Sequence, residues 1–156
     1  MEADFTEILR LNAEWVHFTS QLDDAGLAAL HSQSAYHRIV ESGGHVAAFL
    51  LALREGAGYV SPNYRWFDAR GGAFLYVDRV IVDISQQGRG LASALYGDLI
   101  GFARETGVGR IACELDIEPA NVPSARFHDR HGFIEVGTQW VADGTKRVSL
   151  RELEVR

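Results

Sequence analysis

Residues 74–96, FLYVDRVIVDISQQGRGLASALY, are the stretch that decides the fold of this chain. The first nine of them are rich in β-branched and aromatic side chains, which predicts a strand over 74–82. Two glycines in the QGRG segment end that pattern, and apolar residues at helical spacing predict a helix over 89–105. The first amides of a helix lack partners and carry the positive end of the macrodipole. We therefore expect an anion, in particular a pyrophosphate, at Gln87–Ala92.

Outward from this stretch, shorter patterns predict further strands and helices. Alternating or continuous apolar runs bounded by turn residues predict strands at 5–11, 36–40, 45–53, 110–117, 133–141 and 146–153. Helical spacing predicts helices at 22–31, with Asp23 or Asp24 as its cap, and at 124–130. Segment 56–72 shows no clear period and is expected to be a long connection.

The bulk properties indicate one folded, soluble domain over residues 1–156. The formal net charge of −6 weakens the case for nucleic-acid or anionic-membrane binding, so neither partner is expected. A single cysteine, Cys113, excludes an internal disulfide and leaves no structural zinc ligand set, and we expect it in the core. The acidic start of the chain lacks the pattern of a signal peptide, so we expect a cytoplasmic protein. The sequence gives no reason to expect a metal.

The common nucleotide motifs do not explain the glycine-rich turn. A P-loop requires a lysine followed by serine or threonine after its second glycine, and this chain has no such lysine. The dinucleotide fingerprint fails because Ser93 stands where its third glycine would be. An isolated pair such as Gly88 and Gly90 is also compatible with a tight turn before a packed helix.

Two further glycines, Gly97 and Gly101, lie inside the predicted helix and cost helix stability, which predicts close packing of a strand against them.

Two motifs in order resemble the GNAT superfamily of N-acetyltransferases. Gln87, Gly90 and Ala92 fill the defined places of its motif A. About thirty residues on, a second set has the superfamily spacing: Asn121, Ser124, Phe127, Gly132 and Phe133. The resemblance implies an α/β (α+β) fold, with a mixed, mostly antiparallel sheet of six to seven strands flanked by about four helices.

The resemblance also implies acetyl-CoA as co-substrate. The backbone amides of the turn would hold its pyrophosphate, and Val82 would bond the pantetheine arm and offer its N–H to the thioester oxygen. The implied coenzyme-binding residues are Val80, Ile81, Val82, Gln87, Gly88, Arg89, Gly90, Leu91, Ala92, Asn121, Ser124, Phe127 and His128. For Asn121 a helix cap is an equally good interpretation and a compatible one, and Arg89 either reaches a coenzyme phosphate or is solvated.

Acetyl transfer to an amine needs a base for the nucleophile and an acid for the thiolate. Many members carry the acid as a tyrosine seven residues after the motif asparagine, and His128 takes that place here. Histidine titrates near neutrality, so His128 is the acid candidate, with ordering of a water or of the thioester, or plain packing, as alternatives.

Three carboxylates are candidates for the base. Glu114 and Asp116 share one face of their predicted strand, and Asp116 takes the place of a base glutamate in some members. Asp78 lies in an otherwise apolar strand, and an ion pair with neighbouring Arg79 is not assured because the two point to opposite faces. The alternative for one or two of them is a solvated carboxylate on a strand face.

The acceptor is expected beside segment 56–72, which we interpret as a substrate lid. Tyr64 and Trp66 could wall an apolar slot and Arg65 could hold a carboxylate, which suggests an amino acid or a similar amine. The candidate acceptor residues are Asn63, Tyr64, Arg65, Trp66 and Arg79. A lid packed on the core, or a contact in a homodimer, is the alternative for the aromatics.

The sequence therefore predicts an enzyme that transfers the acetyl group of acetyl-CoA to a primary amine of a small molecule by direct attack. A protein acetyltransferase acting on an N-terminus or a lysine is one alternative. A non-catalytic acyl-CoA sensor is another, because the motif tyrosine is replaced by His128.

Overall fold

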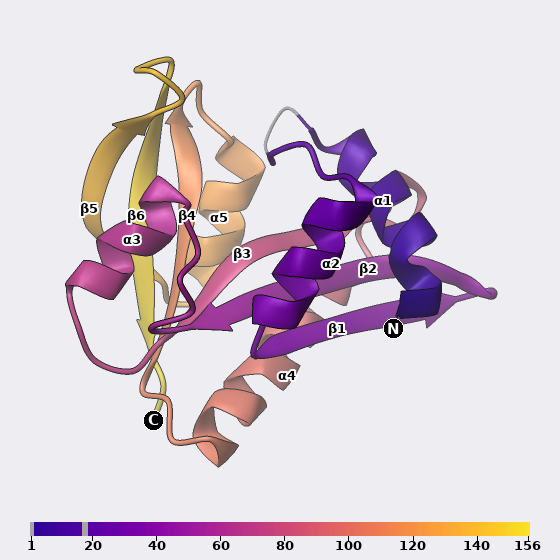
Figure 1. Ribbon diagram of the computed structural model, residues 1–156, viewed down its shortest axis with the longest axis horizontal. Helices are drawn as coiled ribbons and strands as arrows, with labels where there is room; N and C mark the ends of the chain where they lie inside the picture. Colours follow the sequence, from indigo (N-terminus) through magenta and orange to yellow (C-terminus); the bar gives the residue numbers. More distant parts are fainter. Residues whose placement is uncertain (1, 17–18) are drawn as a thin grey trace. The chain divides into compact units, whose positions relative to one another are not determined.

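The computed structural model describes residues 2–16 and 19–156. The strands follow the order β1-β2-β3-β4-β6-β5 in one sheet. The chain divides into two compact units, one of Met1–Leu53 with Val77–Phe102 and one of Arg54–Tyr76 with Ala103–Arg156. Strand β3 contributes residues to both units (Figure 1).

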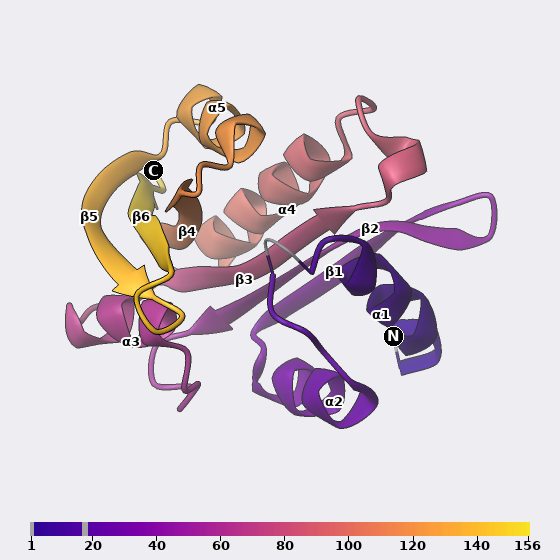
Figure 2. The same cartoon turned by 90° about the horizontal axis from the view of Figure 1, so that it is seen from above.

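The first unit combines a hairpin, most of β3 and three helices. Its elements are η1 (Glu2–Asp4), α1 (Phe5–Glu14), α2 (Asp24–Gln33), β1 (Tyr36–Ser42), β2 (His45–Arg54), β3 (Leu75–Val82), η2 (Ile84–Gln86) and α4 (Leu91–Glu105). Figure 2 shows α1 and α2 on one face of these strands and α4 on the other. Residues 46–53 of β2 are all buried, which explains their continuous apolar run.

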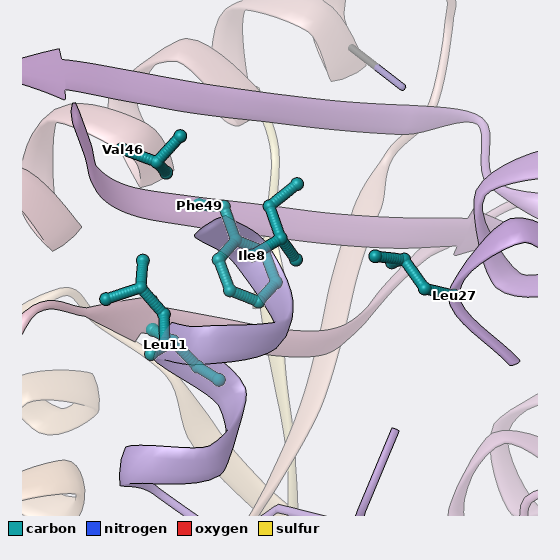
Figure 3. Packing of buried hydrophobic residues seen from close by; sticks show 6 residues of the cluster. Ile8, Leu11, Leu27, Val46 and Phe49 are labelled. Atoms are coloured by element: carbon teal, nitrogen blue, oxygen red, sulfur yellow. The ribbon is translucent and has the colours of Figure 1, made fainter. Parts of the chain in front are cut away.

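The core of the first unit joins both N-terminal helices to the hairpin. Side chains from α1, α2, β2 and β3 meet there: Ile8, Leu11, Leu27, Val46, Phe49 and Ile81 (Figure 3). Each is at most 3% exposed. At roughly 1.5–3 kcal/mol for each buried aliphatic or aromatic side chain, this cluster holds α1 and α2 on the strands.

The second unit is built on three strands covered by a helix on each face. Its elements are α3 (Pro62–Ala69), the start of β3, β4 (Arg110–Glu118), α5 (Val122–Arg130), β5 (Ile134–Val141) and β6 (Lys146–Glu154). β3 and β4 pair in parallel, and β6 pairs antiparallel with both β4 and β5. Figure 2 shows α3 and α5 on opposite faces of β4, β6 and β5.

Most predicted elements are confirmed within a few residues, but three expectations are wrong. Residues 5–11 form a helix, because the side chains that are buried or pack on the core recur at helical spacing, at positions 5, 8, 9, 11, 12 and 15. Segment 56–72 contains α3, which begins with Pro62 in its first turn. An ideal Cβ at Gly97 or Gly101 meets nothing within 4 Å, so no close packing requires these glycines.

Candidate active site

The turn between β3 and α4 in the first unit is built around two left-handed glycines. The Asp83 carboxylate accepts hydrogen bonds of 2.8 Å from the backbone N–H and the hydroxyl of Ser85 and so starts the 3-10 turn η2. Gly88 and Gly90 follow with φ of +77° and +74°, values that favour glycine. Helix α4 then begins at Leu91.

This turn fits a phosphate. An ideal Cβ at Gly88 or Gly90 meets no atom within 4 Å, so the backbone there is open to a ligand. The first amides of α4, at Leu91 and Ala92, have no acceptor within the helix and add the positive end of its dipole. Arg89 is exposed and donates to the side-chain oxygen of Gln86. Two candidate sources of phosphate contacts, amides and a guanidinium, therefore lie in one short segment.

The last residue of β3 receives two side-chain donors. The carbonyl oxygen of Val82 accepts from the indole N–H of Trp15 and from the amide of Gln87, each at 3.0 Å. These bonds fix the end of the strand to α1 and to the turn. Trp15 was not among the predicted site residues. The helical spacing of Ile8, Leu11 and Trp15 is the sequence signal that could have found it.

Asp78 and Arg79 form the ion pair that the sequence left open. The guanidinium Nε of Arg79 donates to the Asp78 carboxylate at 2.7 Å. The Arg79 side chain is 3% exposed and the Asp78 side chain 5%. The remaining guanidinium nitrogens bond Asn12 and Ser20. The pair forms although the two residues point to opposite faces of the strand, because the flexible Arg79 side chain bends back to Asp78. Arg79 is buried and connects Asn12 of α1 with Ser20.

The remaining predicted coenzyme residues of β3 differ in burial. The Ile81 side chain lies in the core cluster at 3% exposure, whereas Val80 is half-buried. Any contact of Ile81 with a coenzyme would therefore be made by its backbone.

In the second unit, Asn121 is the N-cap of α5. Its side-chain oxygen accepts from the backbone N–H of Ser124 at 3.3 Å, and its own N–H bonds the carbonyl of Asp116 at 2.9 Å. The cap uses only the oxygen of the carboxamide, so the amide –NH₂ can still donate to a ligand. The two interpretations of Asn121 are thus compatible in the structure.

His128 is buried in the last turn of α5 and holds one defined tautomer. Its Nδ1 lies 2.7 Å from the carbonyl oxygen of Ser124, which can only accept, so Nδ1 carries the proton. The ring packs edge-on against Phe127 and Phe133. Burial lowers the pKa of His128 below its ordinary value, and the hydrogen bond to Ser124 opposes this effect. At neutral pH the neutral imidazole presents an accepting Nε2.

The two carboxylates of β4 differ in their surroundings. Glu114 accepts from the hydroxyl of Tyr76 at 2.9 Å. Asp116 lies 3.6 Å from the ammonium of Lys146, with its side chain 12% exposed. Burial raises the pKa of the Asp116 carboxyl, and Lys146 partly offsets the rise. The raised pKa brings Asp116 closer than an ordinary aspartate to the pKa range that suits a general base near neutral pH.

The predicted acceptor residues of α3 separate into buried and exposed ones. Tyr64 is 1% exposed, and its hydroxyl donates to the carbonyl of Arg54 at 2.6 Å. Asn63 is buried and accepts from Gln139 at 2.7 Å. Trp66 is half-buried over Gly137, where an ideal Cβ would lie 2.5 Å from the indole. Only Arg65 is exposed, so Tyr64 and Asn63 serve packing rather than an open slot.

The comparisons with known proteins decide the family. The model of the Acetyltransferase (GNAT) family matches residues 3–133. The chain belongs to the GNAT family of acetyltransferases. Acetyl transfer is therefore the class of reaction that its site has to explain. No curated protein sequence matches this GNAT chain significantly.

Solved structures share the fold of this GNAT chain at low identity. Ard1 from Thermoplasma volcanium has a TM-score of 0.78 at 18% identity, over 100% of this chain and 94% of that one. The ribosomal-protein-S18-alanine N-acetyltransferase from Escherichia coli has a TM-score of 0.73 at 16% identity, over 98% of this chain and 88% of that one. The structure of yncA from Salmonella typhimurium with its cofactor acetyl-CoA has a TM-score of 0.72 at 20% identity, over 100% of this chain and 91% of that one. Within residues 2–16 and 19–156, no helix has the length and apolar character to cross a membrane.

Proposed function

We propose that this GNAT chain is an N-acetyltransferase that moves the acetyl group of acetyl-CoA to a primary amine of a small molecule. The observation that carries the proposal is the turn before α4. It combines two glycines at positive φ, open space over both, and the free amides of a helix start. Membership in the family and the acetyl-CoA of the similar yncA structure support the same coenzyme.

In this proposal the contacts with the coenzyme are those that the two GNAT motifs imply. The amides of Gln87–Ala92 hold the pyrophosphate, with Arg89 as an added phosphate donor. The Asn121 amide bonds the pantetheine arm, while its oxygen keeps capping α5. An N–H at the end of β3 would stabilise the charge that develops on the thioester oxygen, a contribution of about 3 kcal/mol for one such donor.

From its position in the motif, His128 is expected to donate a proton as an acid. The structure favours acceptance of a proton as its first step. A neutral ring with the proton on Nδ1 cannot donate from Nε2, so His128 must first accept a proton. We propose that Nε2 takes the proton released by the attacking amine and returns it to the thiolate that leaves. One group then serves as base and as acid, and the proton count balances over the reaction.

Asp116 is the second candidate for the base in this proposal. Burial raises the pKa of its carboxyl, and its backbone carbonyl accepts from the N–H of Asn121, the cap of α5. Glu114 is less suited, because its carboxylate already accepts from Tyr76. Asp78 is left out, because Arg79 neutralises it in a buried ion pair.

Arg65 is exposed on α3 and supports an acceptor that bears a carboxylate, which favours small amino acids and related amines.

Two alternatives to the small-molecule enzyme can be tested directly. The first is an enzyme that acts on proteins, since the Escherichia coli enzyme of the same fold is a ribosomal-protein N-acetyltransferase. The second alternative is a sensor that binds the coenzyme without turnover. Burial lowers the pKa of His128, so the ring lacks the proton that an acid would donate.

The test is release of free thiol from acetyl-CoA in the presence of three acceptor panels. The panels are small amines with a carboxylate, the same amines as methyl esters, and peptides with a free N-terminus. We expect turnover with the first panel, and Arg65→Ala should raise KM for it at least about fivefold without changing KM for the esters. Turnover with peptides alone would favour the protein enzyme, and binding without any turnover would favour the sensor. A cytoplasmic location and a homodimer stay predictions.

A further inference from the structure

The peptide group between Val82 and Asp83 joins β3 to the turn before α4, and hydrogen bonds hold it on both sides. Its carbonyl, that of Val82, accepts from the indole N–H of Trp15 and from the side-chain amide of Gln87, each at 3.0 Å. Its N–H, that of Asp83, donates to the carbonyl of Ala47 on β2 at 2.8 Å. The turn before α4 therefore starts from a fixed peptide group.

Helix α1 contributes two side chains to the start of this turn, which spans residues 83–90 and is named the phosphate turn. Trp15, the C-cap of the helix, donates to the last carbonyl of β3. Arg10 donates to one oxygen of the Asp83 carboxylate at 3.1 Å. The other oxygen of Asp83 accepts from the backbone and the hydroxyl of Ser85 inside the turn. The phosphate turn is thus connected to α1 through the main chain and through a side chain.

Trp15 is the stronger of these two anchors, because its ring is itself held in place. The half-buried indole packs against the core cluster of the first unit, to which α1 also contributes Ile8 and Leu11 (Figure 3). The Arg10 side chain is 41% exposed and shares its guanidinium with two glutamates of α1. Exposed ion pairs of this kind contribute little free energy. The indole N–H is therefore the contact that fixes the end of β3 relative to α1.

The phosphate turn needs an anchor because of its own composition. Gly88 and Gly90 lose more backbone freedom on ordering than other residues do, so one conformation of the turn is costly to hold. A turn that spends time in other conformations binds its ligand more weakly, by the fraction that is competent. We propose that Trp15 is a positioning residue for the coenzyme, whose indole N–H keeps the phosphate turn in the conformation that binds the pyrophosphate. This role rests on the coenzyme site of the proposed function and belongs to a residue that neither GNAT motif contains.

The test variant is Trp15→Phe, which removes the N–H and keeps an aromatic ring on the core. Its matched control is Ile39→Val, because Ile39 of β1 packs against the same cluster. Hydrogen exchange of the full chain is measured without coenzyme over residues 82–87, which contain the bonded amides of Asp83, Ser85 and Gln86. Exchange there should be at least about threefold faster in Trp15→Phe and unchanged in Ile39→Val. Unchanged exchange in Trp15→Phe, or equal acceleration in both variants, would overturn the positioning role.

Calorimetric titration with acetyl-CoA then measures the consequence for the coenzyme in the same three proteins. The Kd should rise at least about threefold in Trp15→Phe, as loss of one hydrogen bond allows, and stay at the wild-type value in Ile39→Val. Absence of binding in the wild type would overturn the proposed function, and the role of Trp15 with it. Binding by the wild type with an unchanged Kd in Trp15→Phe would overturn the role of Trp15 alone.

Discussion

His37 is a residue whose burial makes the folded state sensitive to acid. It is 5% exposed in β1, and its Nδ1 lies 2.9 Å from the Nδ1 of His31 on α2. Its Nε2 is buried and has no hydrogen-bond partner among the described residues. Burial, and then the neighbouring His31, lowers the pKa of His37 to about 4. A proton on this ring is therefore unfavourable only while the chain is folded.

This pKa predicts the direction of the pH dependence. The unfolded chain takes up the proton near pH 6.5 and the folded chain only near pH 4, so the free energy of unfolding falls as the pH drops through that window. The loss attributable to His37 should be on the order of 3 kcal/mol. Urea unfolding at pH 7 and pH 4.5 measures it, and His37→Leu should reduce the loss. His45, 74% exposed, provides the control His45→Gln. Equal losses in the wild type and His37→Leu would contradict this account.

His128 provides a second prediction at the same scale, now for activity. If the neutral ring accepts the proton of the amine, His128→Gln should lower kcat by roughly 10²–10⁴-fold with little change in coenzyme affinity. The acid limb of kcat/KM in the wild type should lie below pH 6.5, since burial lowers the pKa of this ring. A variant with wild-type kcat would exclude His128 from proton transfer.

At the scale of single elements, the glycines of α4 and β5 should respond in opposite directions. Gly97 and Gly101 lie in a helix with open space around an ideal Cβ, so alanine at either should raise the free energy of unfolding by about 0.5–1 kcal/mol. Gly137 lies under Trp66, where an ideal Cβ would lie 2.5 Å from the ring. Gly137→Ala should therefore cost roughly 1–3 kcal/mol.

Chemical denaturation of the three alanine variants tests this contrast. Trp66→Leu gives the Gly137 clash a matched control, because Gly137→Ala should cost less in that background. A destabilised Gly97→Ala would mean that something does pack against α4, as the sequence first suggested. A neutral Gly137→Ala would mean that the Trp66 ring moves freely.

At the scale of the whole molecule, the sequence predicts the order of elements better than it predicts contacts. The two motifs predict β3, α4 and α5 correctly, because glycines and helix caps mark the ends of elements through their effect on the neighbouring backbone. Residues 5–11 were assigned to a strand because their alternation imitates one, and α3 was missed because its aromatic residues show no clean period. The Asp78–Arg79 pair depends on side-chain torsions, which periodicity does not report. The same holds for the contact of His31 with His37.

The central claim, that the turn before α4 holds the coenzyme pyrophosphate, can be tested by calorimetric titration of acetyl-CoA into Ala92→Asp. A carboxylate at the second position of α4 suits the helix dipole, so the free energy of unfolding should stay within about 1 kcal/mol of the wild type. The same charge would repel the pyrophosphate, and we expect affinity to fall at least about tenfold. Ala25→Asp, at the second position of α2, is the matched control and should bind as the wild type does. Wild-type affinity in Ala92→Asp would contradict the claim.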